Sequence, residues 1–242
     1  MSSQHSDRSG SALPAAADKH RAVQAMFDRI APGYDRMNRL MTGGLDQRWR
    51  RLALDTIAVG PNDVLVDLAC GTGDLSELAV ERGAHVIGVD FAREMLRGAR
   101  KRRIRADFVQ ADGARIPLPS GNASVLTCGF ALRNFVALPE IFREAARILR
   151  PGGRLAILEV DRPDNPLVRF GHSLYFDRIV PRLGAWLSDR DAYRYLPEST
   201  VYLPEADELR ALIEKAGFTR VRKQRLLLGS AQLLTAERGE GR

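Results

Sequence analysis

Two glycines of this 242-residue sequence, Gly71 and Gly73, stand between an apolar run at residues 64–69 and a stretch with helical periodicity. Glycine adopts backbone angles closed to other residues and lets a ligand approach the chain without a Cβ in the way. The next apolar run, residues 85–89, ends at Asp90, whose carboxylate can accept hydrogen bonds from both hydroxyls of a ribose. This order of strand, glycine turn and acidic residue predicts a site for a nucleotide-like cofactor.

A third polar segment, residues 110–113, follows the next apolar run and is placed to border an adenine ring and bond its amino group. A glycine pair alone also serves as an ordinary strand-to-helix turn. Open α/β sheets, however, bind ligands at the carboxyl ends of their strands. Three ligand-facing features after three successive strands therefore favour the cofactor site.

The charges near the glycines select the kind of cofactor. A nicotinamide dinucleotide would use the same elements, but the third glycine of its fingerprint is missing, and Asp74 places negative charge where a pyrophosphate would bind. A sulfonium cofactor carries positive charge and no phosphate, so Asp67 and Asp74 favour S-adenosylmethionine. The residues predicted to bind it are Asp67, Gly71, Thr72, Gly73, Asp90, Phe91, Met95, Asp112, Gly113 and Gly129.

The elements that must position these residues alternate between short β-rich runs and amphipathic helices, which predicts βαβ units. We expect an α/β, Rossmann-like fold with a seven-stranded, mainly parallel sheet, helices on both faces, and added N-terminal and lid helices. The expected strands are 64–69, 85–89, 107–110, 124–130, 154–160, 221–227 and 231–236. The expected helices are 19–30, 47–57, 75–81, 92–101, 138–149 and 205–216.

The chain is expected to form one folded unit after a disordered tail. Residues 1–17 are rich in Ser, Ala and Gly without apolar periodicity, so they cannot offset the entropy of ordering. Residues 18–242 form the predicted methyltransferase domain, with N-terminal helices at 18–60. Residues 161–203 interrupt the sheet pattern and are interpreted as a lid insertion with an apolar stripe.

Composition indicates an ordinary globular protein, with 45% hydrophobic and 28% charged residues. No apolar stretch reaches the roughly 20 residues that cross a bilayer, and the first twenty residues lack a secretory signal, so a cytoplasmic location is expected. Cys70 and Cys128 are expected to be reduced. The net charge of +7 is carried by scattered short groups, which is typical of solvated helix faces.

Four stretches resemble the ubiquinone/menaquinone biosynthesis C-methyltransferases, over about residues 23–217. They are Tyr-Asp-Arg-Met-Asn with the following residues 41–50, the loop at 67–75, Phe-Ala-Leu-Arg-Asn at 130–134, and Tyr-Arg-Tyr-Leu-Pro-Glu-Ser at 193–199. The sequence departs from the family pattern at 200–202 and 228–235. The resemblance implies a class I methyltransferase that moves a methyl group from S-adenosylmethionine to a ring carbon of a polyprenylated quinol, making menaquinol from demethylmenaquinol or the matching ubiquinol precursor.

Methylation of a hydroquinone carbon requires help in removing a hydroxyl proton, because the phenolate is the richer nucleophile. Arg133 and Asn134 follow the strand at 124–130 and are the expected catalytic residues. Arg133 would stabilise a phenolate or orient a water, and Asn134 would bond a ring oxygen. A guanidinium is a poor base, so water or a carboxylate must take the proton. The alternative is that Arg133 pairs with Glu198 or Asp46 and holds the lid.

The resemblance also implies that Tyr34, Asp46 and Tyr195 line the substrate pocket, although ordinary helix packing explains the two tyrosines equally well. The insertion carries Arg169, Arg178 and Arg182 beside its apolar stripe, as a surface receiving a lipid-tailed quinol would. Core packing is the alternative. Its His172 has no Cys or His at ligand spacing, so no metal site is expected.

Other functions remain as alternatives. Methylation of cytosine in nucleic acid requires a cysteine nucleophile, and Cys128 stands in a predicted strand without a preceding proline, so no nucleic-acid partner is expected. The chain could instead methylate another small aromatic or lipid, or bind the cofactor without turnover. A homodimer, and peripheral contact with the inner face of the membrane, are both compatible with the sequence.

Overall fold

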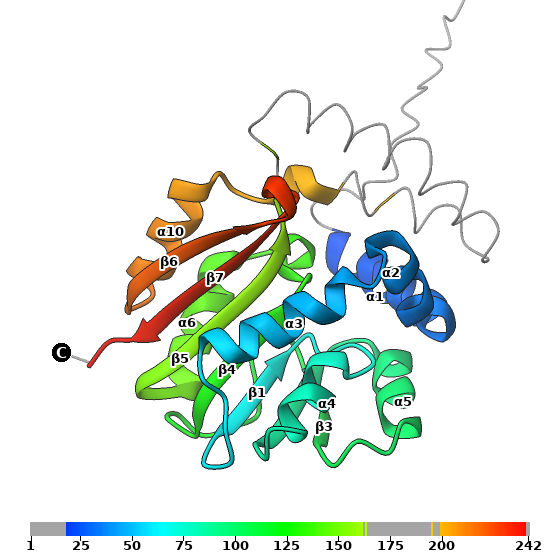
Figure 1. Ribbon diagram of the computed structural model, residues 1–242, viewed down its shortest axis with the longest axis horizontal. Helices are drawn as coiled ribbons and strands as arrows, with labels where there is room; N and C mark the ends of the chain where they lie inside the picture. Colours follow the sequence, from blue (N-terminus) through cyan, green and yellow to red (C-terminus); the bar gives the residue numbers. More distant parts are fainter. Residues whose placement is uncertain (1–17, 162, 164–194, 196–198, 241–242) are drawn as a thin grey trace, which may run out of the picture.

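A seven-stranded sheet forms the centre of the molecule (Figure 1), described in a computed structural model over residues 18–161, 163, 195 and 199–240. The strands are β1 (Val64–Leu68), β2 (His85–Asp90), β3 (Asp107–Gln110), β4 (Ala123–Gly129), β5 (Leu149–Val160), β6 (Phe218–Leu226) and β7 (Ala231–Arg238). Their order is β3-β2-β1-β4-β5-β7-β6, in which β7 pairs antiparallel with β5 and β6 and the other neighbouring pairs are parallel. The predicted Rossmann-like, mainly parallel sheet is confirmed.

Helices cover both faces of this sheet. The helices are α1 (Lys19–Ile30), α2 (Tyr34–Thr42), α3 (Leu45–Thr56), α4 (Asp74–Val80), α5 (Arg93–Lys101), α6 (Leu138–Ile148) and α10 (Ala206–Lys215). Short 3-10 helices are η1 (Ala31–Gly33), η2 (Leu132–Asn134), η4 (Ser199–Tyr202) and η5 (Leu227–Gly229). One core cluster joins α6 and α10 to the sheet, and a second joins α3 and α4 to the opposite face.

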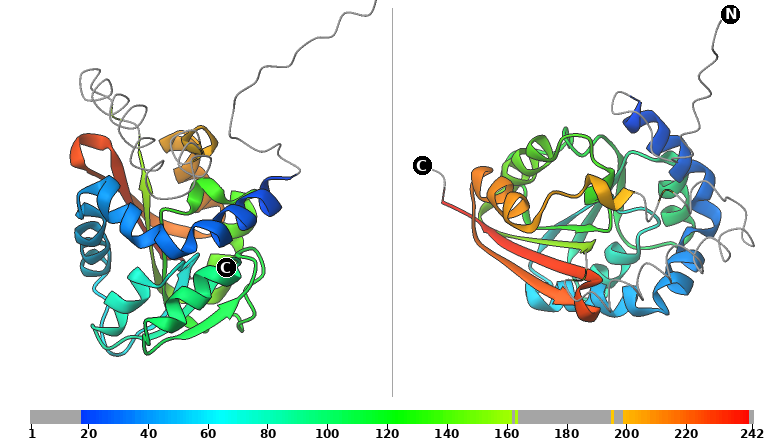
Figure 2. Two further views of the ribbon diagram at one scale, coloured as in Figure 1. Left: turned by 90° about the vertical axis from the view of Figure 1, so that its right-hand side faces the viewer. Right: turned by 90° about the horizontal axis from the view of Figure 1, so that it is seen from above.

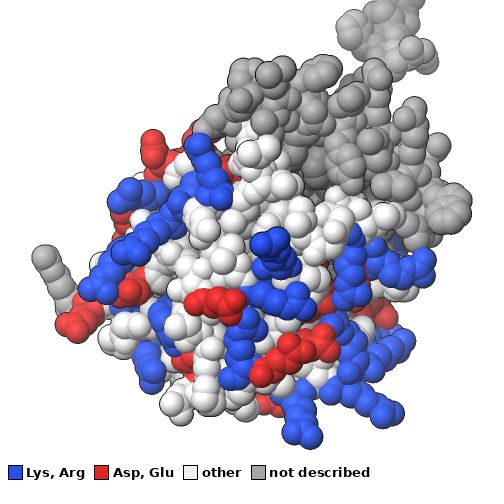
Figure 3. Space-filling model, viewed as in Figure 1, with Lys and Arg blue, Asp and Glu red and all other residues white. Residues whose placement is uncertain are grey.

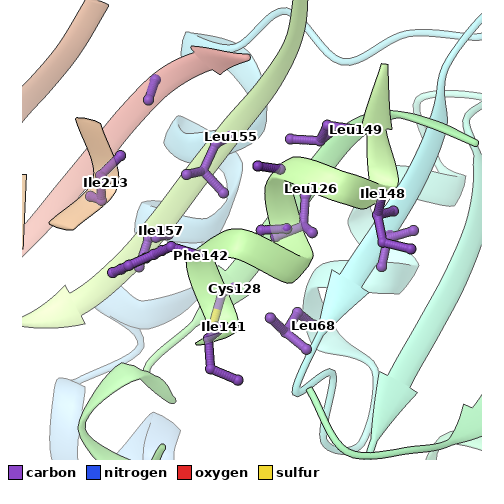
Figure 4. Packing of buried hydrophobic residues seen from close by; sticks show 14 of the residues in the cluster. Leu68, Leu126, Cys128, Ile141, Phe142, Ile148, Leu149, Leu155, Ile157 and Ile213 are labelled. Carbon is purple, nitrogen blue, oxygen red and sulfur yellow. The ribbon is translucent and has the colours of Figure 1, made fainter. Parts of the chain in front are cut away.

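The first core cluster shows why the central strands are apolar along their whole length. Figure 4 shows Phe142 and Ile148 of α6 among the side chains of β4 and β5, including Leu126, Leu155 and Ile157. Each of these five side chains is at most 2% exposed. Complete burial of one such side chain contributes roughly 1.5–3 kcal/mol, so this cluster fixes the strand ends that carry the site.

The N-terminal region contains one helix that periodicity did not predict. Helix α1 ends at Ile30, as expected, and Pro32 then lies in the first turn of η1, where a proline needs no N–H partner. The chain therefore continues directly into α2, which ends at Gly43 with φ +59°. Helix α1 packs against α5, which contacts β2 and β3, so α1 and α5 lie beside this half of the sheet (Figures 1 and 2).

Several expected features fall partly or wholly outside the described residues: the tail at 1–17, most of the insertion at 161–203 with its apolar stripe and arginines, His172, and Glu198. Among the residues that are described, no helix has the length and apolar character needed to span a bilayer. That same part of the chain contains no cluster of three metal-binding side chains. Both cysteines are buried free thiols.

Candidate active site

The turn from β1 into α4 holds the predicted glycines in the backbone conformations that they favour. Gly71 has φ +57° and Gly73 has φ +89°. A Cβ on Gly73 would come within 2.7 Å of Ile104 Cδ1, whereas one on Gly71 would reach only Tyr34, at 4.0 Å. Gly73 therefore shapes and packs the turn, and Gly71 leaves open space above the backbone where a ligand can approach.

Asp90 joins this turn to the end of β2. Its Oδ2 accepts a hydrogen bond from Gly71 N at 2.8 Å, and its Oδ1 accepts one from Ala92 N at 2.8 Å. Burial raises the pKa of Asp90 to about 6, because the charged form loses hydration. A carboxylate has about four acceptor positions, so two remain for the hydroxyls of a ligand.

A cavity with about 990 Å³ of empty space opens at the carboxyl ends of β1, β2 and β4. The predicted residues that line it are Tyr34, Gly71, Asp90, Phe91, Met95, Asp112, Gly113, Gly129 and Asn134. Its other walls are largely apolar, with Leu68, Val89, Phe135 and Ile141 among them. The structure thus brings together most of the predicted set.

Two further predicted residues line a smaller neighbouring pocket with about 320 Å³ of empty space. Asp67 is 1% exposed there, and accepts hydrogen bonds from Ser76 Oγ at 2.7 Å and Thr127 Oγ1 at 3.0 Å. Burial raises the pKa of Asp67, against the opposing effect of these hydrogen bonds. Thr72 donates its hydroxyl hydrogen to Asp35. Gly73 lines neither pocket.

Arg133 lies outside the residues that line either pocket, contrary to the expectation that it contacts the reacting ring. Its guanidinium is buried in an ion pair with Glu159 of β5, and its Nε donates to Ser199 Oγ at 3.2 Å. Its backbone N–H also donates to Glu159, at 3.2 Å. The short helix η2 therefore turns the Arg133 side chain back onto β5.

Asn134 does line the cavity, and Tyr195 orients it. The Tyr195 hydroxyl donates to Asn134 Oδ1 at 3.1 Å. Tyr195 itself is only 3% exposed and does not line the cavity. Burial raises the pKa of Tyr195 to about 12, so the phenol stays protonated and acts as a donor. The amide N–H groups of Asn134 are then left to face a ligand.

Asp46 does not line either pocket, so the expected substrate contact is not found. It is 1% exposed in the first turn of α3, where its Oδ1 accepts from Thr42 Oγ1 at 2.9 Å. Its Oδ2 lies 3.8 Å from Arg50 Nε. Thus neither expected partner of Arg133 is seen: Asp46 faces Arg50, and Glu198 lies outside the described residues. Tyr34, in contrast, lines both pockets.

Three buried charged residues in or near the site were not predicted from the sequence. Lys19 of α1 is 5% exposed and donates from Nζ to the carbonyls of Arg133 at 3.0 Å and Phe135 at 2.9 Å. Glu159 and Arg50 are also buried. Glu159 could have been found, because a charged residue inside an apolar strand is unusual. Nothing in the sequence distinguished Lys19 or Arg50 from other basic residues on amphipathic helices.

Comparison with known proteins identifies the family. Residues 15–237 match the ubiE/COQ5 methyltransferase family. A demethylmenaquinone methyltransferase of Thermus thermophilus is 40% identical over 220 residues, which are 88% of this chain and all of that protein. A ubiquinone/menaquinone biosynthesis C-methyltransferase UbiE of Syntrophotalea carbinolica is 37% identical over 217 residues, covering 87% of this chain and 92% of that one.

A solved structure agrees at the level of the fold. The SAM-dependent methyltransferase of Aquifex aeolicus superposes with a TM-score of 0.55 at 14% identity, covering 78% of this chain and 89% of that one. The family match extends over the glycine turn and Asp90, which were predicted to bind a sulfonium cofactor, and over Asn134, which was predicted to contact the reacting ring. The chain belongs to the ubiE/COQ5 methyltransferase family and is an S-adenosylmethionine-dependent methyltransferase.

Proposed function

We propose that the protein transfers the methyl group of S-adenosylmethionine to a ring carbon of a polyprenylated quinol, converting demethylmenaquinol to menaquinol or acting at the matching ubiquinol step. The names of the relatives support this substrate class. The observation that carries the proposal is a single cavity with Asp90 and Gly71 at one part of its wall and Asn134 at another. Cofactor groups and a ring oxygen therefore have partners within one space.

The residues around the cavity fit the parts of the cofactor. Asp90 would hold the ribose hydroxyls, and the half-exposed Asp112 carboxylate would accept from the adenine amino group. Phe91 and the buried Met95 add apolar wall for the adenine ring. When bound, S-adenosylmethionine supplies an electrophilic methyl group on a sulfonium sulfur.

Asn134 is the residue proposed to contact the acceptor ring. Because Tyr195 occupies its Oδ1, its amide N–H groups can donate to the quinol oxygen and stabilise a phenolate. The ring carbon gains a methyl group as the S–CH₃ bond breaks, and one proton leaves the ring to restore the aromatic quinol. In our proposal water takes the hydroxyl proton before the transfer and the ring proton after it, and one proton returns to the ring oxygen, so that one proton is released for each methyl group transferred. Lys19 and Arg133 act indirectly, by holding η2 in place.

The lipid tail of the substrate leads us to propose peripheral contact with the inner face of the membrane. Leu227 and Leu228 support this, because they are 52% and 77% exposed at the turn between β6 and β7. On the face shown in Figure 3, Lys and Arg side chains are interspersed with Asp and Glu. Flotation with anionic vesicles tests membrane contact, and light scattering tests whether the chain forms a homodimer.

Turnover tests the proposed reaction. Purified protein, labelled S-adenosylmethionine and demethylmenaquinol should yield a labelled, methylated quinol. A protein that binds the cofactor and transfers nothing would be an idle subunit, and transfer to other aromatic or lipid acceptors alone would refute the quinol assignment. In cells lacking the protein, mass spectrometry should find a quinone precursor lighter by one methylene.

A further inference from the structure

The Nε atom of a buried arginine in the smaller pocket has no hydrogen-bond acceptor among the described residues. Arg50 of α3 is 6% exposed, and its Nε is buried without a hydrogen-bond partner. Within the described part of the chain, its nearest carboxylate is Asp46, whose Oδ2 lies 3.8 Å from Nε, beyond hydrogen-bonding distance. Leaving a buried charged donor unpaired is costly. The geometry therefore calls for an acceptor that the described part of the chain does not supply.

The guanidinium lies at the boundary between the two pockets. A Cβ on Gly129 would come within 2.7 Å of Arg50 Nη1, and the Phe130 ring centroid lies 5.4 Å from Arg50 Cζ. The smaller pocket that Arg50 lines shares Tyr34, Gly71 and Gly129 with the main cavity. A ligand whose nucleoside part binds at Asp90 can therefore extend past Gly71 toward Arg50.

We propose that Arg50 binds the carboxylate of the methionyl part of S-adenosylmethionine. This inference rests on the cofactor assignment above. A guanidinium is a fixed fork of donors that matches a carboxylate through two parallel hydrogen bonds. The carboxylate is the only anionic group of this cofactor. Asp67 and Asp74 line the same pocket, where they favour the ligand's ammonium and disfavour a phosphate.

A purely structural role for Arg50 is the competing explanation. Burial raises the pKa of Asp74, yet the neighbouring arginines, Arg50 first among them, outweigh this effect and leave that pKa below its ordinary value. Arg50 also opposes the effect of burial on the pKa of Asp67. If Arg50 served only to balance these buried carboxylates, its removal would affect all ligands of the site alike, whether or not they carry a carboxylate.

Calorimetry with two ligands separates these roles. Decarboxylated S-adenosylmethionine keeps the nucleoside, sulfonium and ammonium groups but lacks the carboxylate. The native protein should bind S-adenosylmethionine about 10- to 100-fold more tightly than this analogue. Arg50→Gln should abolish that preference by weakening S-adenosylmethionine alone. Arg48→Gln, which removes an exposed arginine from the same helix, should leave the preference unchanged.

The outcomes distinguish this inference from the proposed function. An Arg50→Gln protein that retains the native preference, or that loses both ligands equally, would overturn the role of Arg50. A native protein that binds neither ligand would instead refute the cofactor site, and the inference with it. Arg50→Lys keeps the charge balance but not the two parallel hydrogen bonds. It should fold as the native protein does and show a reduced preference, and an undiminished preference would again refute the proposal.

Discussion

Arg133 and Glu159 form a buried ion pair, and removing either charge should lower the stability of the folded protein. Glu159 is 0% exposed and accepts hydrogen bonds from the Arg133 guanidinium, from Arg133 N at 3.2 Å and from Val160 N at 2.8 Å. Glu159→Gln keeps the shape of the side chain and removes its charge. The buried guanidinium would then lack its counter-charge, which costs about 3–5 kcal/mol.

That cost should appear directly in thermal unfolding. For a chain of this size, 1 kcal/mol shifts Tm by about 2–4 °C, so Glu159→Gln should lower Tm by roughly 6–20 °C. Arg133→Met should have a comparable effect, because it leaves the carboxylate buried alone. The double variant removes both charges and should recover at least about 2 kcal/mol relative to the sum of the single changes.

Urea denaturation of the four proteins measures this coupling as a double-mutant cycle. Additive effects, or a Glu159→Gln cost below about 1 kcal/mol, would refute the interpretation of a coupled buried pair. Because neither side chain lines the cavity, cofactor affinity should change by less than about twofold in the folded variants. Turnover should fall, since Asn134 loses its fixed position. A loss of cofactor affinity would place Arg133 at the cofactor after all.

Four further predictions concern the cofactor turn and the ring contact. Asp90→Ala should weaken cofactor binding by roughly 2–4 kcal/mol, and unchanged affinity in calorimetry would remove Asp90 from the site. Because burial raises its pKa to about 6 and the carboxylate is the binding form, native affinity should be level at neutral pH and fall as the pH drops below about 6. Gly73→Ala should destabilise the protein by about 1–3 kcal/mol in urea denaturation, because φ at this position is +89°. Gly60→Ala is the control and should be nearly neutral, because a Cβ at residue 60 would meet open space and the φ there is not positive. Tyr195→Phe should lower kcat, because Asn134 loses its hydrogen-bond donor. The midpoints of the pH–rate profile should not move, because a phenol with a pKa of about 12 does not titrate near neutral pH. A midpoint near neutral pH that disappears in this variant would contradict the prediction.

The parts of the molecule that depend on local order in the chain were predictable. Period-two and helical patterns located the seven strands, and Asp90 and the glycine turn are recognisable because both follow directly from strand ends. The helix α2 was missed because Pro32 and Gly33 suggested a stop, although a proline in the first turn of a helix is tolerated.

Contacts between residues distant in sequence were not predictable in the same way. Arg133 and Glu159 are 26 positions apart, and Lys19 bonds to a carbonyl 114 positions away. No periodicity relates such positions, so Arg133 was expected at the reacting ring, and nothing in the sequence set Lys19 apart from other basic residues. Asp46 was expected at the substrate by resemblance, but its Oδ1 accepts from Thr42 and its Oδ2 faces the buried Arg50.

A crystal structure with S-adenosylhomocysteine would show where the cofactor binds. We expect the ribose hydroxyls at the Asp90 carboxylate, the adenine beside Phe91 and Asp112, and the sulfur facing the part of the cavity lined by Asn134. A nucleoside bound anywhere else, or ribose hydroxyls without contact to Asp90, would contradict it.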